Sequence, residues 1–267
     1  MDARRARSER PRGQHLLRSR HVAEELVAVA DVRPGELVLD LGAGTGAIAA
    51  ALARVRARVQ AVELDARLAA ALRRRFASEP LVEVVHGDAV GARLPEEPFA
   101  VVANLPFAHG TAILRRLLDP RVTLRCAAVV VQWEVAAKRT AVWPSTLLSA
   151  WWGAWHELTL LCRLPACAFA PPPAVDAAVL LAVRRTDPLV EPSDARAFEA
   201  FLRRGFDGGS LRGLVPPRTL KSLALDYGFD PRARPCDLDS RCWAALFASR
   251  RRTSGRSCSL PPRHAPL

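Results

Sequence analysis

The stretch Asp40-Leu41-Gly42-Ala43-Gly44-Thr45-Gly46 decides the fold of this chain. It follows the apolar run Leu37-Val38-Leu39, which we expect to be a buried strand, and it opens a helical pattern at 47–54. Glycines in such a turn let the backbone approach a ligand at the carboxyl edge of a sheet. A dinucleotide-binding turn reads G-x-G-x-x-G. The spacing here is G-x-G-x-G after an acid, so the turn predicts a different ligand.

Strands alternate with helices on both sides of this turn. The periodicity predicts helices at 19–30 (capped by Ser19), 47–54, 67–76, 111–118 and 147–155, and strands at 37–40, 58–62, 82–86, 99–103, 158–161 and 175–183. A further apolar run covers 127–133. Alternation at this spacing indicates an α/β fold with a doubly wound, mostly parallel, Rossmann-like sheet.

The pattern changes after Arg185, where Pro188 and Pro192 mark a linker. Beyond it we expect a small C-terminal helical domain with short helices at 194–204, 217–226 and 239–249. The predicted organisation is a basic arm at 1–20, an α/β domain at 21–185, a helical domain at 186–250 and a basic, disordered tail at 251–267.

The net charge of +12 gathers at the two ends of the chain. Residues 1–20 carry seven Arg against Asp2 and Glu9, and residues 250–267 carry five Arg and no acid. Arginine-rich arms are typical of proteins that bind nucleic acids. The Arg-rich composition could also reflect a GC-rich genome, and that alternative stays open.

The six cysteines show neither a CxxC pair nor a matching histidine spacing, so we expect no metal site. We expect buried free thiols at Cys126, Cys162 and Cys167. No apolar run approaches the length of a membrane span. We therefore expect a cytoplasmic protein in a reducing compartment, with no membrane partner.

Acidic residues end the next two predicted strands. Glu63 is placed to hold ribose hydroxyls, and Asp88, in Gly87-Asp88-Ala89, could accept a hydrogen bond from an adenine amino group. A ligand with a ribose, an adenine and a cationic tail instead of a phosphate is S-adenosylmethionine. The three loops, in order along the chain, predict this cofactor.

Asn104-Leu105-Pro106-Phe107, at the end of strand 99–103, contains no strong base. The Asn104 side-chain oxygen and the Leu105 carbonyl could each accept one hydrogen of an exocyclic amine, which turns the nitrogen lone pair outward. Pro106 restrains Leu105 to an extended backbone, and Phe107 can stack on a base. The tetrapeptide therefore favours methylation of a nucleobase amine, although alone it could be an ordinary Asn-X-Pro turn.

Taken in order, the motifs resemble the rRNA adenine N6-methyltransferases, especially the actinobacterial erythromycin-resistance (Erm) type. They are Gly13-Gln14-His15-Leu16-Leu17, Asp40 to Gly46, Glu63-Leu64-Asp65, Gly87-Asp88-Ala89, Asn104-Leu105-Pro106-Phe107, Gln132-Trp133-Glu134-Val135-Ala136, Leu147-Leu148-Ser149-Ala150-Trp151-Trp152 and Phe169-Ala170-Pro171-Pro172-Pro173-Ala174-Val175-Asp176. The resemblance covers roughly residues 10–250 and implies methyl transfer to one adenine of 23S rRNA, unassembled or precursor, by a monomer. It also implies resistance to macrolide- and lincosamide-type drugs, with residues 21–185 as the methyltransferase domain and the helical domain at 186–250 binding RNA.

The resemblance assigns roles to individual residues. The implied cofactor set is Gln14, His15, Leu16, Gly42, Gly44, Gly46, Glu63, Leu64, Asp88, Ala89 and Asn104. The implied catalytic set is Asn104 and Leu105, which hold the target amino group, and Phe107 and Phe169, which sandwich the flipped base. His15 stands where the family commonly has Asn, and Phe107 has no hydroxyl, so it can contribute stacking only.

Other functions share some of these features. The housekeeping small-subunit dimethyladenosine transferases have the same catalytic elements, and some non-catalytic nucleic-acid-binding relatives keep the fold. The G-x-G-x-G spacing does not fit a nicotinamide oxidoreductase, which would have G-x-G-x-x-G. His15 could be a surface residue and Phe169 could serve packing alone. The arginines of helix 67–76 could be a solvated face or a phosphate-binding surface.

Overall fold

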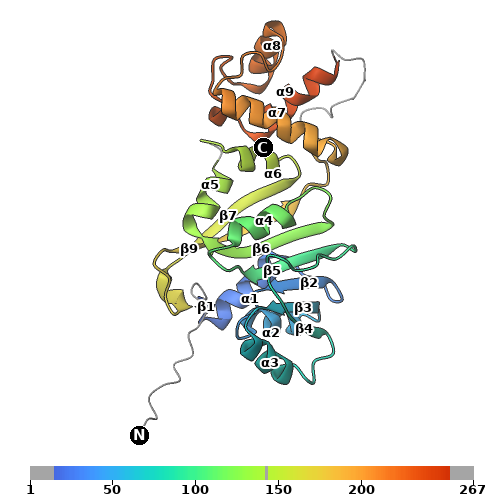
Figure 1. Cartoon of the computed structure of the whole chain (residues 1–267), viewed down its shortest axis with the longest axis vertical. Helices are drawn as coiled ribbons and strands as arrows, with labels where there is room; N and C mark the ends of the chain where they lie inside the picture. The colour runs from blue at the N-terminus through green and yellow to red at the C-terminus, as the bar shows by residue number, and fades with distance from the viewer. Residues whose placement is uncertain (1–14, 142–143, 253–267) are drawn as a thin grey trace. The chain divides into compact units, whose positions relative to one another are not determined.

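The computed structural model describes residues 15–141 and 144–252. Figure 1 traces its helices and strands. The strands are β1 (Leu16–Leu17), β2 (Leu37–Leu41), β3 (Arg58–Glu63), β4 (Val82–His86), β5 (Phe99–Asn104), β6 (Leu124–Gln132), β7 (His156–Leu164), β8 (Phe169–Ala170) and β9 (Ala177–Arg184). The α-helices are α1 (Arg20–Val29), α2 (Ala47–Arg54), α3 (Ala66–Arg75), α4 (Gly110–Leu117), α5 (Trp133–Thr140), α6 (Leu147–Trp152), α7 (Ala195–Gly208), α8 (Pro217–Tyr227) and α9 (Ser240–Arg252).

Seven strands form one sheet in the order β4-β3-β2-β5-β6-β9-β7. The pairs from β4 to β6 are parallel, whereas β9 runs antiparallel to β6. The chain order reverses between β2 and β5, which is the point where α/β sheets bind ligands. The predicted doubly wound, mostly parallel sheet is therefore confirmed.

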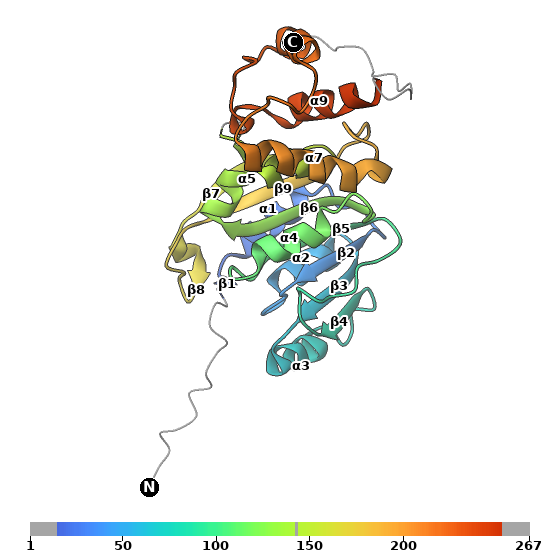
Figure 2. The same cartoon turned by 45° about the horizontal axis from the view of Figure 1, so that its top comes forward.

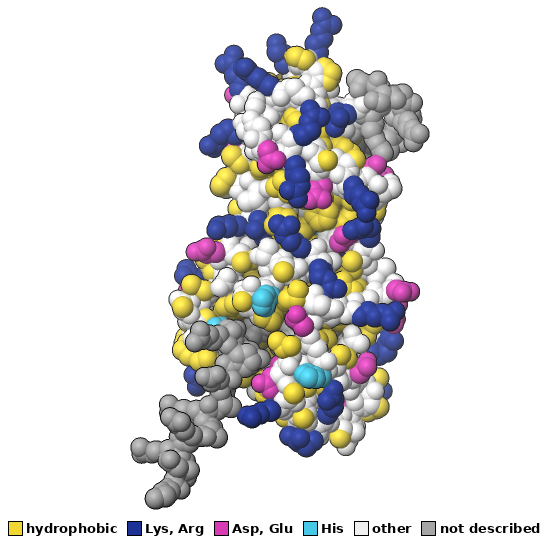
Figure 3. Space-filling model, viewed as in Figure 1, with side chains coloured by type: hydrophobic (Ala, Val, Ile, Leu, Met, Phe, Trp, Pro, Cys, Tyr) yellow, Lys and Arg dark blue, Asp and Glu magenta, His cyan; other side chains and the backbone are white. Residues whose placement is uncertain are grey.

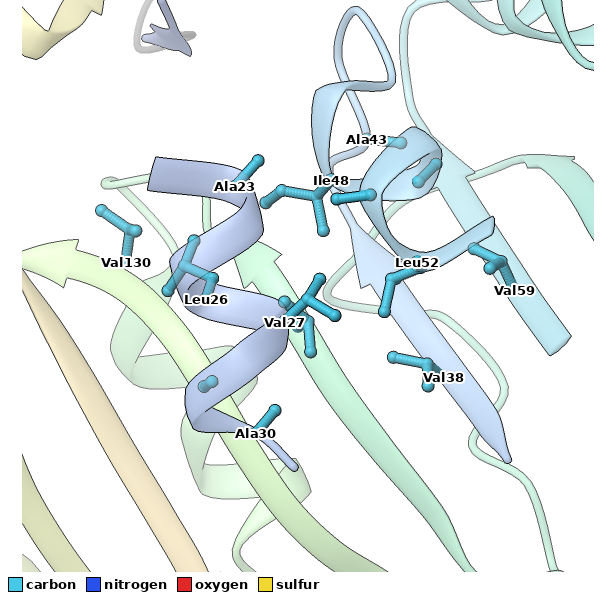
Figure 4. Close-up of a cluster of buried hydrophobic side chains, with 14 of the residues drawn as sticks. Ala23, Leu26, Val27, Ala30, Val38, Ala43, Ile48, Leu52, Val59 and Val130 are labelled. Atoms are coloured by element: carbon cyan, nitrogen blue, oxygen red, sulfur yellow. The ribbon is translucent and has the colours of Figure 1, made fainter. Parts of the chain in front are cut away.

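Helices cover both faces of this sheet (Figure 2). Val38 of β2 and Val130 of β6 pack with Leu26 and Val27 of α1 and Ile48 of α2, as the close-up in Figure 4 shows. Side chains alternate along a strand, so Val131 points to the opposite face. There its methyl group lies 3.7 Å from the position of a Cβ on Gly110, the first residue of α4. α4 thus packs on the face opposite α1 and α2.

Most predicted elements are confirmed within a residue or two. The Ser19 hydroxyl caps α1 by accepting the N–H of Val22, and the helix at 47–54 has the predicted bounds. The prediction missed α5, because the apolar run at 127–133 gave no sign of ending at Gln132. The helix predicted at 147–155 ends at Trp152, before Gly153.

The thiol prediction is partly wrong. Cys126 is buried, and its thiol donates to the Ala30 carbonyl at 3.3 Å. Cys162 and Cys167 are exposed instead of buried. Cys162 lies on β7, which forms an edge of the sheet, and Cys167 lies in the short 3-10 helix Ala166–Ala168. One side of each segment therefore meets solvent.

The chain forms two compact units, and the sheet belongs to the first. That unit extends to Ala137 and includes Glu157–Arg184; the second comprises Lys138–His156 and the residues from Arg185 onward. The second unit has its own aromatic core, in which Trp155 contacts Phe198 and Trp243 stacks on Phe206. Residues 138–156, which we expected in the α/β domain at 21–185, cluster with this helical unit.

Candidate active site

A cavity of about 260 Å³ lies in the first unit where β2, β3 and β5 end. It brings together most of the residues that the sequence predicts for the cofactor and the target base. Its lining consists of His15, Leu16, Gly42, Gly44, Val62, Glu63, Leu64, Asp88, Ala89, Asn104, Leu105, Pro106, Phe107, Ala108 and His109. Segments from five places in the chain therefore converge on one site.

The glycine turn is held against the neighbouring strand. The N–H groups of Gly42 and Ala43 both donate to the Val62 carbonyl, at 2.8 and 3.0 Å. Gly44 has a positive φ of 56°, and a Cβ added to it would lie 2.6 Å from the Cδ2 of Leu16. Glycine is required here because the N-terminal segment lies directly on the turn.

Glu63 ties the turn to the end of β3. Its buried carboxylate accepts the N–H of Gly44 at 2.7 Å through Oε2 and the N–H of Asp65 at 2.8 Å through Oε1. Each carboxylate oxygen has a second lone pair. Glu63 can therefore brace the turn and still accept hydroxyl groups from a ribose in the cavity.

The loop after β4 supplies another wall. Asp88 is exposed, and its Oδ1 accepts the N–H of Val90 at 2.9 Å, while Ala89 beside it is buried. Leu64, directly after the neighbouring strand β3, also lines the cavity and is largely exposed. An acid beside small apolar side chains suits the polar edge and the flat faces of an adenine.

Asn104 is oriented by the N-terminal segment. Its Nδ2 donates to the backbone carbonyl of His15 at 2.6 Å, and its buried Oδ1 has no hydrogen-bond partner among the described residues. The backbone of the next residue, Leu105, is held because its N–H donates to the Val130 carbonyl at 3.1 Å. Asn104 therefore lines the cavity with an amide whose buried oxygen has no hydrogen-bond donor among the described residues.

Three aromatic rings meet beside Asn104. The Phe107 ring lies 5.3 Å from the His15 ring and 5.8 Å from the Phe169 ring, which it contacts edge to face at 74°. Phe169 is fully buried and does not line the cavity. The two phenylalanines do not form parallel walls in this structure, so a base between them requires a change in ring position.

The sequence did not predict how His15 is held. Leu16 and Leu17 of β1 pair antiparallel with Ala170 and Phe169 of β8. The His15 Nδ1 lies 2.9 Å from the Pro171 carbonyl, and the Ala170-Pro171 peptide bond is cis. We call residues 15–18 the strap. Two-residue strands have too little periodicity to be predicted from sequence.

One predicted cofactor residue, Gly46, lies elsewhere. Gly46 does not line the cavity; it caps α2, and a Cβ there would lie 2.6 Å from the Cδ2 of Leu72. A glycine at position 46 is therefore explained by the close packing of this residue against α3, where a side chain would clash. Gln14 lies outside the described residues, so its predicted role is not placed.

Asp40, at the start of the turn, is buried beneath α2, and neither carboxylate oxygen has a hydrogen-bond partner among the described residues. Burial raises the pKa of Asp40 to about 8. The nearby backbone N–H of Ala49 opposes the rise, and the carboxylate of Glu63 adds to it. Asp40 is therefore largely protonated at neutral pH.

The cavity fits S-adenosylmethionine better than a dinucleotide. Its lining includes the carboxylates of Glu63 and Asp88 but no Lys or Arg among the described residues. A pyrophosphate would meet this acidic lining unfavourably, whereas a cationic sulfonium suits it. Across the described ranges, we find no group of three or more side chains placed to hold a metal ion, and no helix long and apolar enough to cross a membrane.

Comparison with known proteins agrees with this geometry. The sequence profile of the family described as "Ribosomal RNA adenine dimethylase" matches residues 6–209. The mycinamicin-resistance protein MyrB of Micromonospora griseorubida is 35% identical, over 94% of this chain and 87% of its own. The ribosomal RNA small subunit methyltransferase A of a Synechococcus strain is 32% identical, over 88% and 90%.

Among solved structures, the 23S rRNA methyltransferase ErmE superposes with a TM-score of 0.79 at 30% sequence identity. The match covers 87% of this chain and 98% of ErmE. The fold, the acidic nucleoside cavity and the match over most of the chain agree. The chain belongs to the ribosomal RNA adenine dimethylase family.

Proposed function

We propose that this protein is an S-adenosylmethionine-dependent enzyme that methylates N6 of a specific adenine in 23S rRNA and so confers macrolide- and lincosamide-type resistance. The observation that carries the proposal is Asn104, which lines one cavity with Glu63 and Asp88 and whose buried Oδ1 has no hydrogen-bond partner among the described residues. The likeness to a mycinamicin-resistance protein and to a 23S rRNA methyltransferase supports the choice of substrate.

The residues divide the work between cofactor and target. Glu63 holds the ribose hydroxyls, Asp88 and Ala89 the adenine, and Gly42 and Gly44 let the backbone lie close to the methionine part. When bound, S-adenosylmethionine supplies an electrophilic methyl group on a positively charged sulfur.

The target amine is activated by acceptors and not by a base. Asn104 Oδ1 and the Leu105 carbonyl each accept one N6 hydrogen, which turns the nitrogen lone pair toward the methyl group. Phe107 supports the base by stacking. The N–C bond would form as the S–CH3 bond breaks, which leaves S-adenosylhomocysteine. The surplus N6 proton can then pass to water, so no residue has to deprotonate the amine beforehand. His109, exposed at the start of α4, is not needed as a catalyst.

The RNA-binding surface extends beyond the cavity in this proposal. Lys and Arg side chains are spread over the face shown in Figure 3, and the helical unit carries exposed Arg203, Arg204, Arg212, Arg218 and Lys221. We assign that unit to contacts with rRNA phosphates. The arms at 1–14 and 253–267 lie outside the described residues. Their Arg content predicts that removing 1–10 or 253–267 weakens RNA binding and flattens its salt dependence.

The competing function is methylation of small-subunit rRNA. The likeness to a small subunit methyltransferase supports this alternative. Purified protein should be given labelled S-adenosylmethionine with protein-free 23S rRNA, protein-free 16S rRNA, and the assembled subunits. We expect label in 23S rRNA, with unassembled RNA preferred, and a monomer acting in the cytoplasm. Label confined to 16S rRNA or its precursor particles would establish the competing function.

A further inference from the structure

The loop between β4 and β5 forms the adenine side of the cavity, yet it contains no regular secondary structure. Within it, the Val90 N–H bonds to Asp88, and Arg93 pairs with Glu96. Both interactions are local to the loop. They shape its turn but do not attach residues 88–94 to the rest of the protein.

Arg116 makes that attachment. Its Nη1 donates to the Val90 carbonyl, and its Nη2 donates to the Ala92 carbonyl at 2.8 Å. In the described part of the chain, we find no other hydrogen bond that joins residues 88–94 to another element. Arg116 is partly buried in the last turn of α4. A planar guanidinium can reach two carbonyls at once, which a lysine ammonium on a flexible stem does poorly.

The helix that carries Arg116 begins directly after the loop that follows β5, in which the sequence predicts the contacts to the target base. α4 starts at Gly110, a few residues after Asn104 and Phe107, and the His109 N–H donates to the Pro106 carbonyl at 2.9 Å. The opposite end of this short helix holds the loop that carries Asp88. One rigid element thus spans the two halves of the cavity.

We infer that Arg116 is a positioning residue that holds the Asp88-Ala89 loop in its cofactor-binding conformation. The inference rests on the proposed function, because it assigns this loop to the adenine of S-adenosylmethionine. Without the guanidinium, the two carbonyls lose their donors and the loop samples other conformations. Apparent affinity then falls in proportion to the fraction of molecules in which the loop remains in place.

The chain offers a matched control in Arg184, the last residue of β9. It is also partly buried, and it donates through Nη1 to the Val122 carbonyl and through Nη2 to the Pro120 carbonyl. Those carbonyls precede β6, at the amino edge of the sheet and away from the cavity. Removing Arg184 also deletes a guanidinium that donates to two backbone carbonyls, but it leaves the contacts of the Asp88-Ala89 loop unchanged.

The test is isothermal titration of S-adenosylmethionine and of 5′-methylthioadenosine, which lacks the amino-acid part, into full-length protein without RNA. We expect R116A to raise both dissociation constants by about tenfold, R116K to retain part of the affinity, and R184A to stay within about twofold of wild type. Methyl transfer at saturating cofactor should fall much less than cofactor affinity in R116A.

The outcomes separate this inference from the proposed function. Wild-type protein that binds neither ligand would overturn the proposed function. If wild type binds both and R116A does so equally well, or if R184A weakens binding as much as R116A, the positioning role of Arg116 is wrong. Should R116A fail to fold, R116Q and R116K give the same comparison.

Discussion

The side-chain amide of Asn104 donates a hydrogen bond to the backbone carbonyl of His15 at 2.6 Å, across 89 positions of sequence. Because Nδ2 is occupied by this bond, Oδ1 is the atom of the amide that has no hydrogen-bond partner among the described residues. The strap therefore fixes the orientation of the Asn104 side chain. In the proposed function, this orientation decides which end of the amide meets the target base.

The Asn104→Asp variant keeps an acceptor but loses the donor, so a carboxylate oxygen would face the His15 carbonyl. We expect methyl transfer to fall about 100-fold or more in both Asn104→Asp and Asn104→Ala. S-adenosylmethionine affinity should stay near that of wild type. The control is His15→Ala, which keeps the backbone carbonyl and should lose less activity. Full activity in Asn104→Asp would show that the amide orientation does not matter.

Gly44→Ala should disturb the strap. The added methyl group would lie 2.6 Å from Leu16, and φ at this residue is 56°. Gly35→Ala is the control, because its φ of 78° is also strained but nothing lies within 4 Å of the added atom. We expect both variants to lose about 1 kcal/mol of stability from backbone strain, and only Gly44→Ala to lose cofactor affinity. Titration calorimetry and urea unfolding measure the two effects.

A second substitution tests whether the clash with the strap is the cause. Combining Leu16→Ala with Gly44→Ala removes the side chain that the new methyl group would meet. The double variant should therefore bind S-adenosylmethionine better than Gly44→Ala alone. In a double-mutant cycle, the losses in binding free energy of the two single variants should not add up to the loss in the double variant. Strictly additive losses would contradict packing of Leu16 on Gly44 as the source of the effect.

Asp40 should make stability depend on pH. Its folded-state pKa of about 8 lies above the usual 3.8, so between these values the folded state holds a proton that the unfolded state has lost. The contribution of Asp40 to the free energy of unfolding should therefore be largest below about pH 4. That contribution should then fall by up to about 1.4 kcal/mol per pH unit and level off above about pH 8.

Asp40→Asn removes this titration while nearly keeping the shape of the side chain. Urea unfolding from pH 5 to pH 8.5 should show a shallower decline for the variant than for wild type, with the largest gain in relative stability at the alkaline end. Asp207→Asn, at an exposed position on α7, is the control and should follow wild type. Parallel curves for Asp40→Asn and wild type would mean that Asp40 is ionised in the folded protein.

Phe107 should contribute to the target and not to the cofactor. Phe107→Ala removes a stacking contact worth about 1–3 kcal/mol, so kcat/KM for rRNA should fall about 5- to 150-fold. S-adenosylmethionine affinity should change little. Phe107→Tyr keeps the ring and should remain near wild type. Equal losses in Phe107→Ala and Phe107→Tyr would argue against stacking.

The sequence predicted the sheet well because its signals are local. Buried parallel strands such as 99–104 are continuous apolar runs, and the loops at their carboxyl ends meet at one edge by topology alone. Glu63, Asp88 and Asn104 could therefore be placed together without coordinates, and the cavity contains all three.

The contacts that orient the site could not be predicted in the same way. The pairing of Leu16 with Ala170 joins two-residue strands far apart in sequence, and Arg116 reaches the Val90 carbonyl through geometry that no spacing rule encodes. Phe169 was predicted to face the base, but an aromatic residue before prolines has the same pattern when it is buried. Side-chain direction at such positions depends on tertiary packing.

The most direct test of the central claim is mass spectrometry of 23S rRNA from macrolide-sensitive cells, with and without expression of this chain. We expect one adenine to gain one or two methyl groups at N6, and Asn104→Ala, expressed at the same level, to add none. Unmodified 23S rRNA beside newly methylated 16S rRNA, or full modification by the Asn104→Ala variant, would contradict it.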